Sequence, residues 1–303
     1  MVKIEFSVEL DYQVTRSTEF EFILHAARTP RQTVLKEELE VIPEIPATLE
    51  VSSFFPNQHV RLHAEPGPLK LKYSASLNVS HYLVPRSQLK EVPIADLPLD
   101  VLHFVHPSRY CPSDRFYELA AQQFGNMASG YARVQAIADW VRDRTCFQIG
   151  TSNSLNCAMD TLNNRVGVCR DFAHLMISIC RALNIPARYV TSIDYGADPA
   201  LGPTDFHAYV EVYLSGRWYI FDPTGISVTS GLVRLATGRD ANDVAFATLF
   251  GSAIWTVPKV AISTVDYPVG GDAKPFPVDL AVSTDGSMDS QIDLVNNGYQ
   301  MAA

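Results

Sequence analysis

A cysteine, a histidine and an aspartate in the second half of this 303-residue chain have the types and settings that nucleophilic catalysis requires. Cys169 directly precedes apolar residues that recur at three- and four-residue steps up to Leu183, which predicts a helix beginning at the cysteine. In the first helical turn, unpaired N–H groups and the helix dipole favour a thiolate. The pattern therefore predicts a sulfur nucleophile at Cys169. A cysteine buried in a core helix is the alternative that the helix alone leaves open.

The histidine and the aspartate belong to two later segments that have strand patterns. His207 stands near the start of FHAYVEVYL, in which residues alternate with period two, and Asp222 ends RWYIFD. Between these segments, Ser215-Gly216 is a turn signal. A nucleophile on a helix tip, a base on one strand and a carboxylate on the next make up a Cys-His-Asp triad.

The length of the turn decides whether the triad can form. A two-residue turn pairs Leu214 with Arg217 and puts His207 and Asp222 on one face as diagonal neighbours. Their side chains are then within reach of a hydrogen bond. A three-residue loop would turn Asp222 to the opposite face. The triad hypothesis therefore requires the tighter turn or a compensating bulge.

Three segments also carry a family resemblance. GVCRDFAHL, DFHAYVEVYL and RWYIFDPTG resemble the core motifs of the transglutaminase-like superfamily, a papain-related cysteine acyl-transfer fold. RLATGRDANDVAFATLFG resembles a stretch typical of its bacterial branch, and the N-terminal third is similar to the β domain that precedes the core there. The resemblance implies Cys169 as nucleophile, His207 as general base and acid, and Asp222 as the residue that orients the imidazole.

The resemblance leaves the reaction open, because the family includes protein cross-linkers, peptidases, deamidases and inactive relatives. We expect a cysteine-dependent enzyme that acts on peptide or protein amides through a thioester and that is hydrolytic, a peptidase or amidase. One alternative is a protein-glutamine transglutaminase, and another is a non-catalytic binding module that keeps the fold. We expect no metal and no cofactor, because charge and geometry activate the nucleophile. The oligomeric state is not predicted.

Further site residues follow from the chemistry of amide attack. An oxyanion forms and needs two donors. The backbone N–H of Cys169 is the expected first donor, and Gln148 in FQIGTS is a candidate for the second. Arg239 and Asp240 in ATGRDAND are candidates for the rim of the pocket, although a capped helix start explains that segment equally well.

The remaining patterns predict an α+β protein. Short segments rich in β-branched and aromatic residues predict an N-terminal β-sandwich domain over residues 1–105. Helical patterns, the cysteine helix and antiparallel strands then predict a papain/transglutaminase-like core over 106–262, with helices packed on a sheet. Residues 263–303 are expected to form a C-terminal strand and a poorly anchored tail.

Composition limits the classes of partner and the cellular compartment that we expect. The net charge of -9, without a dense run of Lys or Arg, argues against nucleic acid or an anionic membrane and leaves a peptide or protein substrate. No stretch approaches the roughly 20 apolar residues that span a bilayer. The five cysteines include no C-x-x-C pair, so the four besides Cys169 are expected to be buried small hydrophobes. The start alternates like a strand rather than a signal peptide, and we expect a cytoplasmic protein.

Overall fold

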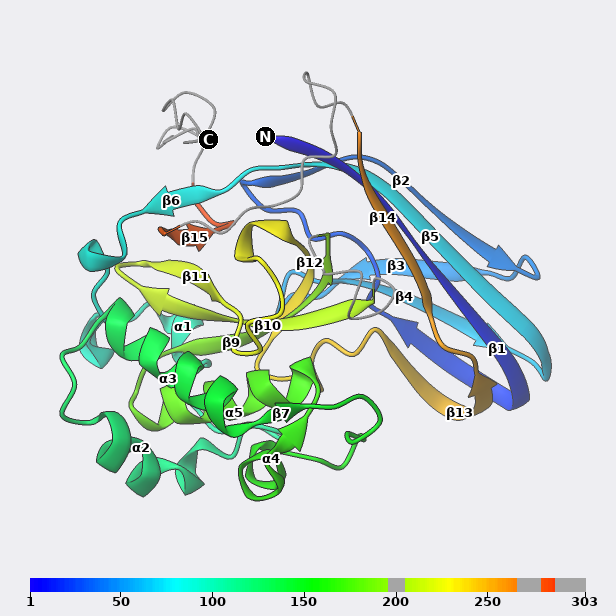
Figure 1. Cartoon of the computed structure of the whole chain (residues 1–303). Helices are drawn as coiled ribbons and strands as arrows, with labels where there is room; N and C mark the ends of the chain where they lie inside the picture. Colours follow the sequence, from blue (N-terminus) through cyan, green and yellow to red (C-terminus); the bar gives the residue numbers. More distant parts are fainter. Residues whose placement is uncertain (196–204, 266–278, 287–303) are drawn as a thin grey trace.

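The structure is a computed structural model that describes residues 1–195, 205–265 and 279–286. It has the predicted α+β organisation, with a large antiparallel sheet beside a core of helices packed on a smaller sheet (Figure 1). The large sheet contains β1 (Val2–Phe22), β2 (Gln32–Ile42), β3 (Ala47–Val51), β4 (Gln58–Ala64), β5 (Gly67–Val79), β13 (Ala247–Trp255) and β14 (Lys259–Val265). The core sheet contains β9 (Ala187–Asp194), β10 (Phe206–Leu214), β11 (Arg217–Phe221) and β12 (Leu232–Gly238).

Five α-helices, four 3-10 helices and two short strand pairs complete the described elements. The 3-10 helices are η1 (Arg86–Gln88), η2 (Ile94–Asp96), η3 (Ser113–Arg115) and η5 (Thr229–Gly231). The helices are α1 (Leu99–Leu102), α2 (Tyr117–Phe124), α3 (Tyr131–Arg144), α4 (Ala158–Asn164) and α5 (Cys169–Ala182). The pairs are β6 (Tyr82–Val84) with β15 (Ala281–Ser283), and β7 (Cys146–Phe147) with β8 (Val166–Gly167). The longest of these helices, α3 and α5, have 14 residues each. Within the described ranges, no helix combines the length and the apolar character needed to cross a bilayer.

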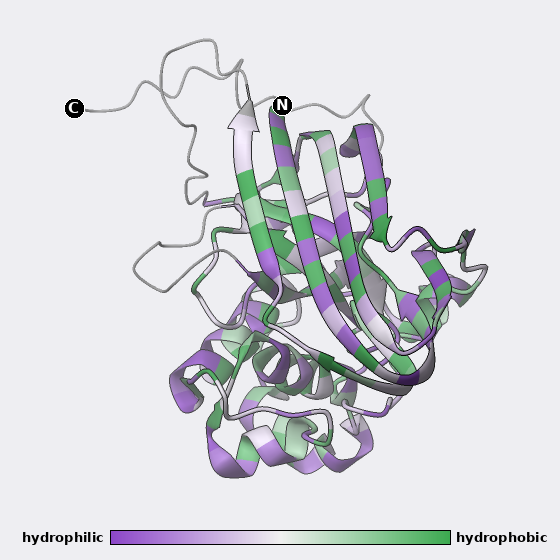
Figure 2. Ribbon diagram, turned by 90° about the vertical axis from the view of Figure 1, so that its right-hand side faces the viewer, coloured by the Kyte–Doolittle hydropathy of each residue, from purple (hydrophilic) through white to green (hydrophobic). Residues whose placement is uncertain are grey.

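The long strands of the N-terminal sheet alternate between apolar and polar residues, as Figure 2 shows. One face is therefore buried. Where the sequence predicted a two-sheet sandwich, the described strands form one seven-stranded sheet. Its apolar face packs against core-sheet residues, among them Ile193, Val233 and Leu235. The core thus supplies the second layer.

The last two strands of the large sheet come from a part of the sequence that was assigned to the core. β13 and β14 return to β1 and pair with it antiparallel, Trp255 beside Tyr12 and Val260 beside Val8. The expected boundary at residue 262 therefore does not separate the two sheets. Period two marks a segment as a strand with one buried face, but it does not say which distant strand it will join.

Helix α5 is the centre of the core. It packs against β9 and β10 on one side and against α2, α3 and α4 on others. The predicted apolar face is buried, and so are the other sides of the helix from Asp171 onward. Even Arg181 is 2% exposed, with its guanidinium donating to the carbonyls of Ala187, His106 and Arg239. A helix enclosed on every side is a rigid mount for the residue at its first turn.

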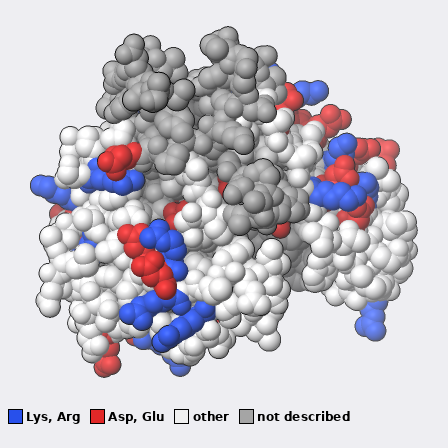
Figure 3. Space-filling model, viewed as in Figure 1, with Lys and Arg blue, Asp and Glu red and all other residues white. Residues whose placement is uncertain are grey.

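The described C-terminal piece closes the far face of the core sheet. β15 pairs with β6, and Asp285 beyond it forms ion pairs with Arg188 and Arg234. Both arginines also pair with Glu211 on β10, which is fully buried. Two positive and two negative groups balance in this network. Acidic and basic side chains also lie next to each other on the face of the molecule in Figure 3.

Candidate active site

The N-terminus of α5 presents Cys169 as the first helical residue, half-buried. The carboxylate of Asp171 fixes this turn, because it accepts the N–H of Val168 at 2.8 Å and the hydroxyl of Ser152 at 2.8 Å. A Cβ at Gly167 would lie 2.6 Å from the Cβ of Asp171. Glycine is thus required by the space that the capping aspartate occupies, rather than by a sharp turn into the helix.

The hairpin between β10 and β11 has the register that the triad requires. Leu214 pairs with Arg217, which confirms the two-residue turn. Ser215 and Gly216 both have positive φ, 47° and 83°, as a hairpin turn matched to strand twist demands. β11 then ends one residue before Asp222. The regular pairing of β10 with β11 therefore stops just before Asp222.

The structure brings His207 and Asp222 together. Their side chains are 9% and 2% exposed, and Nε2 of His207 lies 3.4 Å from Oδ1 of Asp222. The ring N–H is not directed closely enough at Oδ1 to count as a geometric hydrogen bond, so the contact is best described as a charge pair. The carboxylate of Asp222 also accepts the N–H and the hydroxyl of Thr224 and the N–H of Ser227.

These contacts set the charge of the pair. Burial alone would lower the pKa of His207, but the negative charge of Asp222 and a hydrogen-bonding contact with Cys169 raise it well above the ordinary value. Burial would raise the pKa of Asp222, and the positive charge of His207 together with the donors from Thr224 and Ser227 lowers it instead. Asp222 is therefore ionised and His207 is readily protonated. Since Nε2 faces Asp222, the other ring nitrogen is left for the thiol.

Comparison with known proteins shows to which family this chain belongs. Residues 117–223, which contain the cysteine, the histidine and the aspartate, match the transglutaminase-like superfamily. Residues 2–100 match the N-terminal domain of bacterial transglutaminases. A protein of known structure from Cytophaga hutchinsonii, named "Putative Cysteine Protease", is 39% identical and has a TM-score of 0.87 over 93% of this chain and 97% of its own. The chain belongs to the transglutaminase-like superfamily.

Two other proteins are less similar to this transglutaminase-like chain. An uncharacterised protein of Mycobacterium leprae is 29% identical over 175 residues, which are 56% of this chain and 61% of that protein. The match thus spans less than two thirds of its length. The periplasmic domain of TgpA from Pseudomonas aeruginosa is 16% identical, with a TM-score of 0.37 over 75% of this chain and 91% of that domain.

Gln148, the predicted second oxyanion donor, lies close in the backbone to the transglutaminase-like cysteine. Its N–H donates to the carbonyl of Gly167 at 2.9 Å, which extends the parallel pairing of β7 with β8. Its carbonyl accepts the hydroxyl of Thr151, and the residue is exposed. The chain at Gln148 is therefore fixed beside a residue two positions before Cys169. The role of its side chain stays a prediction.

Arg239 and Asp240, the predicted rim residues, have partners within the fold. Arg239 forms an ion pair with Asp243, with Nε 2.9 Å from Oδ2. Asp240 is 1% exposed and accepts the N–H groups of Tyr110 and Asn242. The segment is a turn and not the start of a helix. The carboxylate of Asp240 links two loops, and none of these contacts is with Cys169.

Sequence reasoning missed the residues that support the triad. Thr224 stands two positions after Asp222, a spacing at which a hydroxyl and an N–H commonly bond to an aspartate, so a signal existed in Asp-Pro-Thr. Ser227 gave no such signal. Arg170 donates to Ser152 at 2.6 Å and holds the loop before α4 against the helix tip. Arg170 therefore has a structural role at this end of the helix.

The other cysteines divide into two groups. Cys111 and Cys180 are buried, and burial raises the pKa of the Cys111 thiol to about 12. Cys146 is exposed and Cys157 is half-buried, so the expectation that all four are buried is wrong for these two. Both lie at the ends of short elements, where the local pattern carries little information about burial. Among the residues that the structure describes, no cluster of three or more His, Cys, Asp or Glu side chains could hold a metal ion.

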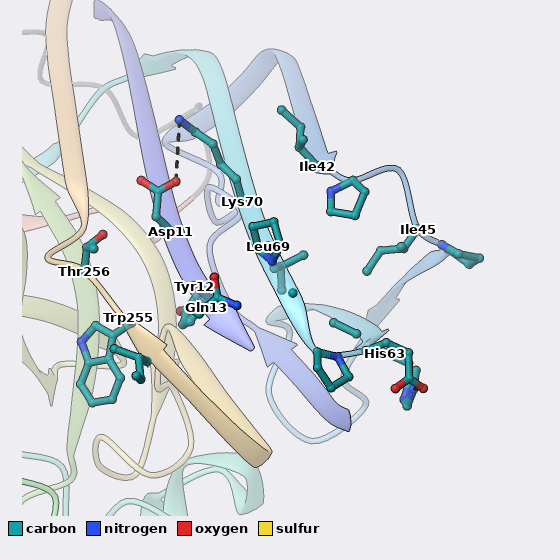
Figure 4. Close-up of a pocket in the computed structure, with 18 residues that line it drawn as sticks. Asp11, Tyr12, Gln13, Ile42, Ile45, His63, Leu69, Lys70, Trp255 and Thr256 are labelled. Carbon is teal, nitrogen blue, oxygen red and sulfur yellow. Dashed lines mark hydrogen bonds and ion pairs between the residues drawn. The ribbon is translucent and has the colours of Figure 1, made fainter. Parts of the chain in front are cut away.

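A large apolar pocket lies elsewhere, on the N-terminal sheet (Figure 4). It measures about 1120 Å³, and its lining includes Tyr12, Ile42, Leu69 and Trp255. An Asp11–Lys70 ion pair lies at its edge. None of its lining residues belongs to the Cys-His-Asp site, so the pocket is separate from the candidate chemistry.

Proposed function

We propose that the chain is a cysteine-dependent acyl-transfer enzyme that hydrolyses amide bonds in peptides or proteins. The observation that carries the proposal is the charge pair of His207 with the buried Asp222, 3.4 Å apart, next to a cysteine at the first turn of α5. A raised histidine pKa favours an imidazolium at neutral pH. An imidazolium and a helix N-terminus both stabilise a thiolate at Cys169.

In the first half of the reaction the sulfur replaces the amine. The thiolate of Cys169 attacks the carbonyl carbon and forms a C–S bond, and the electron pair of the C=O moves to oxygen. As the first residue of α5, Cys169 has an N–H without an acceptor inside the helix, and this group donates to the oxyanion. The imidazolium of His207 gives its proton to the nitrogen as the C–N bond breaks, and a thioester remains.

In the second half a water molecule releases the acid. Neutral His207 takes a proton from the water while the oxygen attacks the thioester carbon. The C–S bond then breaks, the thiolate returns, and the imidazolium is restored. Asp222 keeps its charge throughout and stabilises the imidazolium, held in place by Thr224 and Ser227.

Support for water as the acceptor comes from the Cytophaga hutchinsonii protein, which is named a protease. With an amine as acceptor, the same thioester would give a cross-link. The two outcomes differ only in what resolves the thioester, so one experiment distinguishes them.

The test is to incubate the purified protein with a peptide library, with and without an added primary amine, and to analyse the products by mass spectrometry. Shorter peptides support the proposal, a gain of about one dalton without cleavage indicates an amidase acting on side chains, and amine adducts indicate a transferase. Cys169→Ala must abolish every product, whereas Cys146→Ala, which removes an exposed thiol, must not. A library left unchanged by the native protein, with Cys169 unreactive to iodoacetamide, would favour the binding module.

A further inference from the structure

Strand β13 forms an exposed edge of the N-terminal sheet. It pairs with β1 along one side (Figure 1), and within the described ranges no other strand pairs with its second side. Three of its large apolar residues are mostly exposed: Phe250 at 64%, Ile254 at 66% and Trp255 at 64%. Unpaired edges with exposed apolar side chains are where further strands add.

This edge lacks the protection that the other edges of the sheet have. From residue 247 to 255 the strand contains no charged residue and no proline. By contrast, β2 carries Lys36 and three glutamates, β3 carries Glu50, and β14 begins with Lys259. Charges on an edge strand prevent pairing with another chain, so β13 is the edge on which pairing is not opposed.

Along β13, the backbone N–H and C=O groups of the odd-numbered residues point away from β1. The N–H of Ser252 donates to the hydroxyl of Thr18, and its carbonyl accepts the hydroxyl of Thr15, both on β1. The N–H of Thr256 likewise donates to the carbonyl of Asp11 on β1. Because backbone groups alternate in direction along a strand, the outward N–H and C=O groups belong to the residues between. These are Leu249, Gly251, Ala253 and Trp255.

The residues of β13 are symmetric in size about Ser252. The segment LFGSAIW reads large, large, small, serine, small, large, large from 249 to 255. If two copies of this strand run antiparallel with Ser252 opposite Ser252, Phe250 lies opposite Ile254 and Leu249 opposite Trp255. The residues with outward backbone groups then face each other as hydrogen-bonded pairs. A two-fold axis produces this pattern, because every contact between two residues of different copies then occurs twice, once with each copy supplying the first residue.

We propose that β13 pairs antiparallel with β13 of a second copy of this chain, centred on Ser252, and joins the two N-terminal sheets. A second copy fits better than an unrelated peptide because one sequence supplies both halves of every apolar pair. Four aromatic side chains, Phe250 and Trp255 from each copy, would be covered together with two isoleucines and two leucines. Full burial of an aromatic side chain covers about 150–250 Å², and these side chains are already partly buried, so the contact covers less than the roughly 1,200 Å² of a stable interface. The expected dimer is therefore a weak one. The pairing is independent of the proposed enzymatic activity.

The test is the sedimentation of the full chain over a wide concentration range. We expect a dimer that dissociates on dilution. Phe250→Lys and Ile254→Glu should each weaken dimerisation more than about a hundredfold, because each puts two charges opposite apolar residues. The matched control is Leu49→Lys on the β3 edge, where the leucine is 52% exposed; it should not change the dissociation constant. Unchanged thermal melting of each variant, measured at a concentration at which the native chain is also monomeric, verifies that the fold is intact.

A mixture of the two variants tests the register. In a mixed dimer, Lys at 250 of one copy faces Glu at 254 of the other, and the remaining pair is the native Phe250 with Ile254. Mixing should therefore restore dimerisation that neither variant shows alone. A native chain that stays monomeric at all concentrations overturns the proposal, as does a dimer that Phe250→Lys leaves intact. Failure of the mixture to restore the dimer overturns the Ser252-centred pairing.

Discussion

Two buried histidines, one on β10 and one on α5, have opposite surroundings. His207 is 8% exposed and faces the carboxylate of Asp222. His174 is fully buried five residues after Cys169, with its ring 5.1 Å from those of Tyr110 and Tyr189. Its Nε2 accepts the N–H of Ala241 at 3.1 Å, so this nitrogen carries no proton.

The difference shows that burial does not decide the charge of an imidazole by itself. Burial lowers the pKa of His174 well below its ordinary value, and the positive charges of Arg170 and Arg181 lower it further. Burial acts on His207 in the same direction, but Asp222 reverses the result. A partner carboxylate thus turns one buried histidine into a proton donor, while the other is a packing residue.

The largest expected effect is on turnover. His207→Gln should lower kcat/KM by about 10⁴-fold or more, because the variant has no group to protonate the leaving amine. The rate is measured on the peptide identified by the library. A His207→Gln enzyme within tenfold of the native rate would remove His207 from the mechanism and end the contrast with His174.

Asp222→Asn should have a smaller but still severe effect. The N–H groups of Thr224 and Ser227 bond to different oxygens of the carboxylate, so the single amide oxygen keeps one of these two hydrogen bonds. The fold is retained, while the charge that raises the pKa of His207 is lost. We expect a fall of about 10²- to 10⁴-fold in kcat/KM, measured on the same peptide, with a nearly native melting temperature. Unfolding of this variant would instead assign Asp222 to the stability of the turn.

His174→Phe should affect stability rather than catalysis. Phenylalanine keeps an aromatic ring between Tyr110 and Tyr189 but leaves the N–H of Ala241 without its acceptor. The free energy of unfolding should fall by about 1–3 kcal/mol in urea titrations, and kcat/KM per folded molecule should stay within about tenfold. A loss of turnover as large as that of His207→Gln would contradict the contrast between the two sites.

The smallest effect is on the pH dependence of stability, and the two histidines should act in opposite directions. His174 takes up a proton near pH 6.5 only when unfolded, so it destabilises the fold as the pH falls below 6.5. The contribution of His207 is complete below pH 6.5 and is lost as the pH rises through its raised folded pKa. Urea titrations from pH 5 to 9 measure the free energy of unfolding. As the pH falls, this free energy should rise in the native chain relative to His207→Gln and should decrease in the native chain relative to His174→Phe. The same trend for both variants would show that the imidazoles share one charge state.

Several features could be predicted because they depend on local patterns. The helix that begins at Cys169, the two-residue turn at Ser215-Gly216 and the resulting register follow from periodicity and turn chemistry, and the structure has all three. The burial of Asp240 and the exposure of Cys146 could not be predicted in this way. Both depend on which distant segments cover them.

The sequence by itself determined the order of the elements, the position of the cysteine at a helix tip, and the common face of His207 and Asp222. These follow from spacings within a helix or a single hairpin, where few dihedral angles fix the geometry. Only the tertiary structure decided that β13 and β14 return to β1 and that Ser227 holds Asp222. It also decided that the pKa of His174 is lowered while that of His207 is raised. Such contacts depend on surfaces that meet after folding, and the same local pattern is compatible with more than one partner.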